Sequence, residues 1–352
     1  MPYLDQFFNL LIKEGASDLH IGEGQPPKIR RHGDVMPIRT EPITREEATV
    51  MMSEICGPKN WELFEERGDL DFAYEMDEAS RFRCNYLKQT NGYGAVFRLI
   101  PTKIASLEDL GIPSVVKEFG HLRGGLVLVT GPTGSGKSTT LAGMVDAINR
   151  RECDHIITME DPIEYAFISA KSCIEQREVG SDVPTFASGL RHALRQDPDV
   201  ILVGEMRDLE TTGAAITAAE TGHLVFSTLH TVNAPQTIER IIDIYPSDQQ
   251  NQIRSMLANT LQAVISQTLF KRADQPGMIP GVEIMLCTPA VRNCIRENRI
   301  FEIPNILETS RALGMQTLDS SIKQLFVNGY ISREDAIAQA AHPEKLERSL
   351  AA

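Results

Sequence analysis

The stretch LVLVTGPTGSGKSTTLAG, residues 126–143, constrains the fold more than any other part of the sequence. Its apolar start predicts a buried strand, and apolar residues recur at helical spacing after the glycines, at Leu141, Met144, Val145 and Ile148. A glycine-rich loop between a strand and a helix lets successive backbone N–H groups turn toward phosphate oxygens. The segment therefore predicts a phosphate-binding loop inside an α/β domain.

The residues of this loop match the spacing G-x-x-x-x-G-K-[ST]. Lys137 would neutralise the β- and γ-phosphates of a nucleoside triphosphate, and Ser138 would ligate Mg²⁺. A glycine-rich turn with an exposed lysine is the alternative, but the matching strand and helix oppose it. We therefore expect ATP and Mg²⁺ as cofactors, with the nucleotide held by Gly131, Thr133, Gly134, Ser135, Gly136, Lys137, Ser138 and Thr139.

Charge and cysteine content disfavour several classes of function. The 352 residues carry a net charge of −13, and with an isoelectric point of about 5.2 the bulk field repels nucleic acids and anionic membranes. The six cysteines include no C-x-x-C pair, so neither a zinc ribbon nor a redox motif is indicated. No apolar run approaches the roughly 18 residues of a membrane span. We expect a protein that neither binds nucleic acid nor inserts into a membrane.

The pattern of apolar residues changes along the chain and predicts two domains. Residues 1–100 mix one helix with short alternating strands, including a hairpin that turns at Asn91-Gly92. Two prolines and a glycine mark residues 101–113 as a linker. Residues 114–352 predict an α/β domain with a mostly parallel sheet, followed by amphipathic helices from about residue 246.

Acidic residues follow two further predicted strands, and the carboxyl ends of parallel strands form the edge where ligands bind. Glu164, in HIITMEDPIEY, is our candidate for the general base; the alternative is a solvated surface acid. Glu205 follows VILVG, where Gly204 occupies the place usually held by a metal-binding Asp. We therefore expect Glu205 to act through the water shell of Mg²⁺.

Histidines flank the predicted strand in GHLVFSTLHT, with His223 before it and His230 after it. Each could sense the γ-phosphate or simply cap the strand, and the residues alone leave both interpretations open.

Phosphoryl transfer also needs cations for the charge that develops on the γ-phosphate, and the sequence places no arginine obviously beside the loop. Ring ATPases often receive this arginine from a neighbouring subunit. The candidates are Arg81, Arg83 and Arg98, on predicted strands of the N-terminal domain. The alternative is that all three are ordinary solvated charges.

Four segments together closely resemble the retraction ATPases of bacterial type IV pili, within the secretion ATPase superfamily: GPTGSGKSTT, TMEDPIEY, LRQDPDVILVGEMRDLETTGAAITAAETGHLVFSTLHT and AVRNCIRE. The resemblance runs nearly end to end. It implies a PAS-like α+β N-terminal domain, a RecA-like ATPase domain and assembly as a hexameric ring. It also implies functional roles for Glu164, Glu205, His223 and His230, and it supports the three N-terminal arginines collectively.

The segment AVRNCIRE, residues 290–297, resembles the AIRNLIRE of the retraction enzymes. With Thr288 as N-cap and Pro289 in the first turn, it predicts a helix whose Ala290, Val291, Cys294 and Ile295 face inward. Its outer face is our candidate for passing force to a partner, and the alternative is a plain packing helix. That face consists of Arg292, Asn293, Arg296 and Glu297.

The resemblance implies a cytoplasmic homohexameric motor, peripheral at the inner-membrane face of the pilus machine. ATP hydrolysis would close N-terminal domains against neighbouring ATPase domains, and the ring would act on a membrane platform protein to withdraw pilin subunits. A paralogous retraction ATPase is a further expected partner. The alternatives are a secretion or conjugation ATPase on the same fold and, disfavoured by the net charge, a nucleic-acid translocase.

Overall fold

The computed structural model describes residues 2–31, 34–77, 80–100 and 103–350. It divides into two compact units, one of Met1–Lys103 with Glu164–Ala166, the other of Ile104–Ile163 and Phe167–Ala352. The boundary falls inside the expected linker, of which residues 101 and 102 lie outside the described residues. Within the described ranges, no helix is long and apolar enough to cross a membrane.

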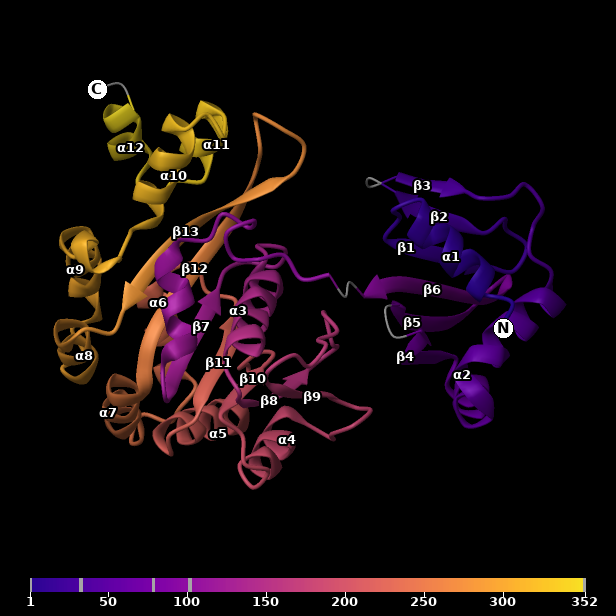
Figure 1. Ribbon diagram of the computed structural model, residues 1–352, viewed down its shortest axis with the longest axis horizontal. Helices are drawn as coiled ribbons and strands as arrows, with labels where there is room; N and C mark the ends of the chain where they lie inside the picture. The colour runs from indigo at the N-terminus through magenta and orange to yellow at the C-terminus, as the bar shows by residue number, and fades with distance from the viewer. Residues whose placement is uncertain (1, 32–33, 78–79, 101–102, 351–352) are drawn as a thin grey trace. The chain divides into compact units, whose positions relative to one another are not determined.

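The first unit contains a six-stranded antiparallel sheet with the strand order β3-β2-β1-β6-β5-β4 (Figure 1). The hairpin of β5 and β6 is confirmed, although its turn is Thr90-Asn91 and Gly92 already belongs to β6. The elements are α1 (Asp5–Lys13), β1 (Asp18–Gly22), β2 (Lys28–Arg31), β3 (Asp34–Pro37), α2 (Arg45–Arg67), β4 (Asp69–Asp77), β5 (Ser80–Gln89) and β6 (Gly92–Ile100).

One face of this sheet forms the core of the first unit with α1 and α2. Phe8 of α1 stacks on Phe82 of β5 with ring centroids 4.0 Å apart, and Met51 of α2 is buried in the same cluster. Because side chains alternate across a strand, the residues between these core positions point to the other face. That face carries Arg81, Arg83 and Arg98, and the partly exposed positions of β5 and β6 follow this alternation.

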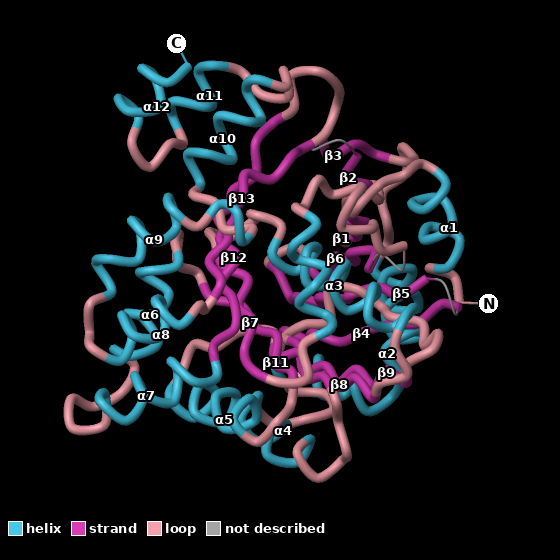
Figure 2. Tube along the Cα trace, turned by 60° about the vertical axis from the view of Figure 1, so that its left-hand side comes forward, coloured by secondary structure: helices cyan, strands magenta, loops and turns pink. Residues whose placement is uncertain are grey.

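The second unit contains a seven-stranded sheet with the order β13-β12-β7-β11-β10-β8-β9 (Figures 1 and 2). Neighbouring strands are parallel except β12 and β13. Every residue of β7, β10 and β11 is buried, as expected for parallel strands covered on both faces. The strands are β7 (Gly125–Thr130), β8 (His155–Glu160), β9 (Cys173–Glu178), β10 (Val200–Val203), β11 (Leu224–Leu229), β12 (Leu261–Lys271) and β13 (Met278–Leu286).

Helices cover the two faces of this sheet unequally. The face with Val127 and Val129 packs on α3 (Lys137–Arg151) and on the 3₁₀ helix η1 (Ser114–His121). The face with Leu126 and Leu128 packs on a larger set of helices. These are α4 (Phe186–Ala193), α5 (Leu209–Glu220), α6 (Ala234–Asp243), α7 (Gln250–Thr260), α8 (Pro289–Arg296) and α9 (Ile303–Thr309).

The expectation that helices dominate from residue 246 onward is wrong for residues 261–286. Most of these residues form β12 and β13, because their β-branched and apolar side chains fill the sheet interior rather than one helical stripe. The far ends of the two strands pack on the C-terminal helices through Phe270 and Ile279. The remaining elements are η2 (Ile300–Glu302), η3 (Arg311–Leu313), α10 (Leu318–Val327), α11 (Arg333–Ala338) and α12 (Pro343–Leu350).

Candidate nucleotide site

The predicted phosphate loop lies between the end of β7 and the start of α3. Gly131, Gly134 and Gly136 have φ angles of 144°, 79° and 85°, a region of backbone conformation that L side chains rarely adopt. A Cβ on Gly131 would also clash with the carbonyl oxygen of Gln267. The glycines of the motif are therefore required by backbone geometry, and their curl is the kind that gathers N–H groups around an anion.

Two polar side chains of the loop fit a phosphate ligand. Ser135 is buried, and its Oγ has no hydrogen-bond partner among the described residues. The Nζ of Lys137 donates to the carbonyl oxygens of Gly131 and Pro132, at 2.9 and 3.0 Å. Burial lowers the pKa of Lys137 below its ordinary value, and the Glu205 carboxylate partly opposes this effect. A buried ammonium with weak neutral partners favours an anion beside it.

Glu205 joins the loop to a cluster of charged residues at the carboxyl ends of β10 and β11. Its Oε1 accepts a 2.6 Å ion pair from Nε of Arg207, and its Oε2 lies 3.4 Å from Nε2 of His230. Both Glu205 and Arg207 act electrostatically on Lys137. The structure thus brings together Lys137, Glu205 and His230, as the sequence predicted for the edge where parallel strands end.

Arg207 corrects one expectation, because an arginine does lie in cis near the phosphate loop. It follows Glu205 by two residues in GEMRD, and its side chain is 69% exposed. The sequence could have identified Arg207, because it lies a few residues after a predicted strand whose carboxyl end meets the phosphate loop.

Gly204 explains why the usual metal-binding Asp is absent before Glu205. A Cβ at this position would lie 3.3 Å from the carbonyl oxygen of Met159 and 3.4 Å from Cα of Glu160, which is tighter than most real contacts. The Gly204 carbonyl also accepts a 2.7 Å hydrogen bond from Oγ1 of Thr228. Backbone of β8 and the Phe186 ring therefore lie against this position and leave little room for a carboxylate.

Gln267 of β12 contacts the loop from behind and was not found from the sequence. Its Nε2 donates to the carbonyl oxygen of Ser135 at 2.6 Å, and its Oε1 accepts from Oγ1 of Thr140 at 3.0 Å. The preceding residue, Ser266, accepts a 2.9 Å bond from Thr130 at the end of β7. The sequence indicated this residue only as a polar side chain within an apolar segment. The prediction of helices in this region meant that its place on a strand beside the loop was missed.

The structure does not place His223 with the phosphate loop. His223 precedes β11, and its carbonyl oxygen accepts from the N–H of Gly125, at the amino end of β7. Six residues of strand separate Gly125 from Gly131, which at about 3.3 Å per residue is roughly 20 Å. Its Nδ1 is within 3.0 Å of the carbonyl oxygen of Ala218. Within this chain, the geometry supports the capping interpretation for His223.

Glu164 and the three N-terminal arginines belong to the first unit. Glu164 is exposed in the segment Glu164–Ala166 between β8 and β9. Arg83 lies opposite Arg98 in the register of β5 and β6 and is 3.9 Å from Asp71. Their roles in hydrolysis stay predictions.

Arg98 differs from the other two arginines in how it is held. Its Nε donates to Oδ1 of Asp18 at 2.7 Å, and its side chain is 66% exposed whereas that of Asp18 is 4% exposed. Burial alone would raise the pKa of Asp18, but hydrogen bonds from Ser17 and Arg98 outweigh it and hold that pKa below its ordinary value. A buried carboxylate therefore fixes Arg98 while leaving much of its side chain accessible.

Helix α8 follows the predicted capping but differs from the predicted faces at two residues. The Thr288 side chain accepts from the Val291 N–H, and Val291, Cys294 and Ile295 are buried. Ala290, expected inside, is exposed, because the apolar contact is centred on the next turn. Arg292, expected outside, is half-buried.

The guanidinium of Arg292 binds the carboxyl end of α7. It donates to the carbonyl oxygens of Ala258 and Asn259, at 2.5 and 2.8 Å, and to Oε1 of Gln262 at 3.0 Å. These bonds satisfy carbonyls that have no partner inside α7. The exposed outer face of α8 is therefore Asn293, Arg296 and Glu297.

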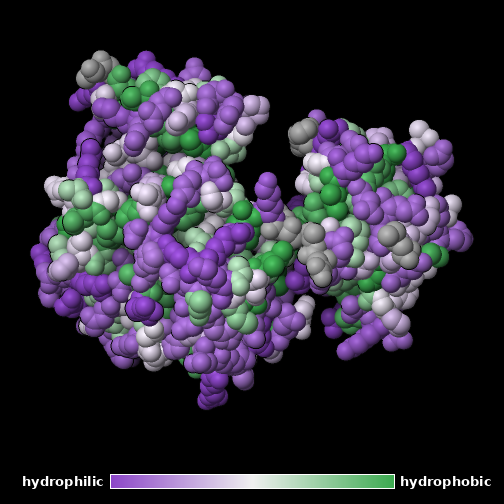
Figure 3. All heavy atoms as spheres, in the orientation of Figure 1, coloured by the Kyte–Doolittle hydropathy of each residue, from purple (hydrophilic) through white to green (hydrophobic). Residues whose placement is uncertain are grey.

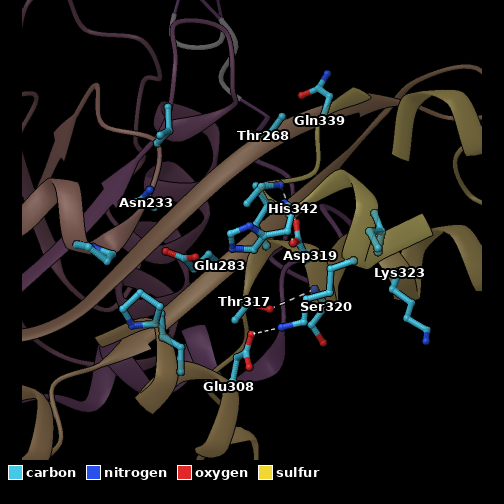
Figure 4. A pocket seen from close by; sticks show the side chains of 18 of the residues that line it. Asn233, Thr268, Glu283, Glu308, Thr317, Asp319, Ser320, Lys323, Gln339 and His342 are labelled. Atoms are coloured by element: carbon cyan, nitrogen blue, oxygen red, sulfur yellow. Dashed lines mark hydrogen bonds and ion pairs between the residues drawn. The ribbon is translucent and has the colours of Figure 1, made fainter. Parts of the chain in front are cut away.

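A cavity of about 750 Å³ lies beside the phosphate loop, between Pro132 and the C-terminal helices. Figure 4 shows that its wall includes Glu283 of β13 together with His342 and Asp319. Glu283 accepts a 2.8 Å bond from the Ala234 N–H, and burial raises its pKa. The face drawn in Figure 3 is mostly hydrophilic with scattered apolar patches.

Comparison with known proteins shows that this chain is similar to secretion system proteins and pilus ATPases. A family model described as type II/IV secretion system protein matches residues 1–300. The chain is 50% identical over 332 residues to the type IV pilus retraction ATPase PilT of Pseudomonas aeruginosa, which covers 94% of this chain and 96% of that protein. It is 38% identical to the type IV pilus ATPase PilU of the same organism, over 96% of this chain and 88% of that protein.

A solved structure agrees over the same length. The crystal structure of the pilus retraction motor PilT with bound ADP is similar to this chain with a TM-score of 0.92 and 43% identity, covering 99% of each chain.

Proposed function

The chain belongs to the type II/IV secretion system protein family, and from that premise we propose that it is a hexameric ATPase motor that powers retraction of type IV pili. The observation that carries the proposal is the meeting of Lys137, Glu205 and His230 at one edge of the sheet, in a chain that shares more identity with PilT than with PilU. The resemblance of AVRNCIRE to the retraction enzymes supports the same choice.

The residues of the site divide the work of phosphoryl transfer. The phosphate loop from Gly131 to Thr139 binds the nucleotide, and Lys137 neutralises its phosphates. Mg²⁺, when bound, supplies further neutralising charge; Ser138 would hold it directly and Glu205 through water. His230 contacts Glu205 and so fixes the carboxylate. Glu164 is the proposed general base that orients and deprotonates water.

The architecture of the family supplies the mechanical part of the proposal. We infer that the second unit is a RecA-like ATPase core, supported by its mostly parallel seven-stranded sheet, and that the first is a PAS-like domain, supported by its antiparallel sheet packed on two helices. Six chains would form the ring, which would lie in the cytoplasm against the inner-membrane platform protein. A PilU-like paralogue is a second proposed partner.

Arg98 is the N-terminal arginine that we favour for service across a subunit interface. A catalytic arginine must reach a neighbouring phosphate in a fixed orientation, and Asp18 supplies that fixation. Arg83, by comparison, contacts an exposed aspartate, Asp71, at 3.9 Å. Arg81 remains a weaker candidate on the same face.

Subunit mixing tests this assignment. An Arg98→Ala subunit and a Lys137→Ala subunit are each expected to be inactive alone, but a mixed ring contains some interfaces with both intact halves and regains hydrolysis. The matched control mixes an Arg83→Ala subunit with the Lys137→Ala subunit, because Arg83 lies opposite Arg98 on the same face of the sheet. Failure of every mixture to regain activity would favour Arg207, in cis, as the charge-stabilising arginine.

A deletion strain tests the function itself. Cells lacking this gene are expected to keep surface pili but to lose retraction and twitching motility, and the wild-type gene, but not a Glu205→Gln allele, restores both. Loss of pili with loss of protein export would instead indicate a secretion or assembly ATPase on the same fold. A salt-sensitive affinity for nucleic acid would indicate a translocase.

A further inference from the structure

We propose that Gln267 is a positioning residue for the phosphate loop, and that it sets the direction in which the Gly136 N–H points. Gln267 is 2% exposed and lies on β12, more than 125 residues beyond the loop in sequence. Its amide donates to the Ser135 carbonyl at 2.6 Å and accepts from Thr140 at 3.0 Å. One side chain therefore connects the loop to the first turn of α3.

The consequence for Gly136 comes from the geometry of the peptide bond. The Ser135 carbonyl and the Gly136 N–H belong to one planar unit, and in a trans peptide they point in opposite directions. Holding the carbonyl against Gln267 therefore turns the Gly136 N–H away from β12. Gly136 has a φ of 85° and is the N-cap residue directly before α3, so its N–H belongs to the set of donors that can face a phosphate.

Gln267 also touches the loop at both glycines of the motif. A Cβ on Gly131 would clash with its carbonyl oxygen, and a Cβ on Gly136 would lie 3.1 Å from its Nε2. The first and last glycines of the loop therefore both lie against residue 267, Gly131 against its backbone and Gly136 against its side chain.

A purely structural role in the strand does not account for this residue. Ala263 and Ile265, which share its face of β12, pack in the apolar cluster with α3. An amide in that row loses hydration on burial and is tolerated only when its hydrogen bonds are made, and both of the bonds described here involve the loop or α3. An apolar residue would fill the same space at less cost if packing were the only requirement.

The test compares Gln267→Leu with Gln262→Leu on the purified full-length protein. Gln262 is the matched control because it lies on the same strand, and its amide bonds to the Gly124 carbonyl and to Arg292 at the opposite edge of the sheet. The measurement is the ratio of the dissociation constants for AMP and ADP, which isolates the contribution of the β-phosphate from that of the base and sugar. Thermal melting without nucleotide is recorded in parallel.

We expect Gln267→Leu to shrink this ratio by about tenfold, in line with an unsatisfied buried carbonyl and a misdirected N–H donor. Gln262→Leu should change it by less than about twofold, since its bond lies far from the loop. A ratio unchanged in folded Gln267→Leu protein would overturn the proposal, even if its melting temperature fell. Absence of any ADP preference in the wild type would instead contradict nucleotide binding by the loop itself.

Thr140→Val gives a second, milder variant if Gln267→Leu does not fold. It removes the bond that holds the Gln267 amide but keeps the Ser135 bond possible. The ratio of the AMP and ADP dissociation constants is expected to fall by about threefold. If Gln267→Leu does fold, adding Thr140→Val to it should lower this ratio little further. A wild-type ratio in Thr140→Val would contradict the positioning role.

Discussion

The two edges of the seven-stranded sheet differ in what their polar side chains bind. At the carboxyl edge, Lys137 and Gln267 bind the phosphate loop, and Glu205 binds Arg207 and lies within reach of His230. At the amino edge, Arg292 binds the end of α7 and His223 binds backbone next to β11. The first set converges on a loop that has no regular structure of its own, while the second set fastens one helix or strand to another.

This difference separates a candidate site for chemistry from contacts that join structural elements within one unit. A site for phosphoryl transfer needs charges held around a curled backbone, and the carboxyl edge provides them. The amino edge instead joins α8 and α7 to the start of β12 and β7 through Arg292 and Gln262. Substitutions at the two edges should therefore differ in their effect on the rate of ATP hydrolysis. The largest losses are expected at the carboxyl edge and the smallest at the amino edge.

The largest effect is expected for Lys137→Ala at the carboxyl edge. The buried ammonium is the main positive charge facing the phosphates, so its loss should lower turnover by at least about a hundredfold. The measurement is steady-state phosphate release by the purified ring. Turnover near the wild-type value would remove the phosphate loop from the mechanism and with it the contrast between the two edges.

Glu205→Gln should have the next largest effect. The substitution keeps the shape of the side chain but removes the charge that attracts Arg207 and acts on Lys137. We expect turnover to fall by about 10²-fold, while ADP affinity changes by less than about threefold. Equilibrium ADP titration distinguishes this result from misfolding. Equal losses of affinity and turnover would mean that Glu205 holds the loop rather than serving the reaction.

His230 and His223 test the comparison on a single strand, since they flank β11 at its two ends. His230→Ala should lower turnover by about tenfold because it loses the contact with Glu205. His223→Ala should lower it by less than about threefold, because its contacts are with Ala218 and Thr221. Turnover of both variants at saturating ATP is the measurement. A larger effect for His223 would show that this residue reaches nucleotide from a position outside its own subunit's loop.

Those parts of the carboxyl edge that depend on residues close together in the sequence could be predicted. The strand, loop and helix around Lys137 are contiguous, and Glu205 and His230 each follow a recognisable apolar strand. Parallel pairing then requires such strand ends to meet. Arg207 was equally accessible by this argument, because it stands two residues beyond Glu205.

Gln267 and Arg292 could not be placed in the same way. Their partners lie 132 and 34 residues away, and each contact depends on where β12 or α7 ends. The apolar runs of β12 and β13 also fit helical or strand structure equally well by periodicity. For His223 the sequence correctly placed the residue before its strand, at the amino edge, whereas the resemblance implied a functional role that the contacts within this chain do not support.

The smallest effect on hydrolysis is expected at α8, where Arg292 and Arg296 must be considered separately. Arg292→Ala removes three hydrogen bonds, two of them at the end of α7, and should lower the free energy of unfolding by about 1–2 kcal/mol. Arg296 is exposed, so Arg296→Ala should change stability by less than about 0.5 kcal/mol. Both variants should hydrolyse ATP within about threefold of the wild type, because α8 contacts the amino edge.

Retraction provides the decisive measurement for α8, because in the proposed motor force must leave the ring through a surface that does not touch nucleotide. If the outer face of α8 is that surface, Arg296→Ala combined with Arg292→Ala leaves an assembled, active ring in cells that are piliated but do not twitch. Arg191→Ala on α4, an exposed arginine of the same unit, is the control and should twitch normally. Normal twitching of the double variant would exclude this face from force transmission. Loss of both ATPase activity and twitching would mean that α8 supports the fold, and the effect of Arg292→Ala alone would then identify its bonds to α7 as the cause.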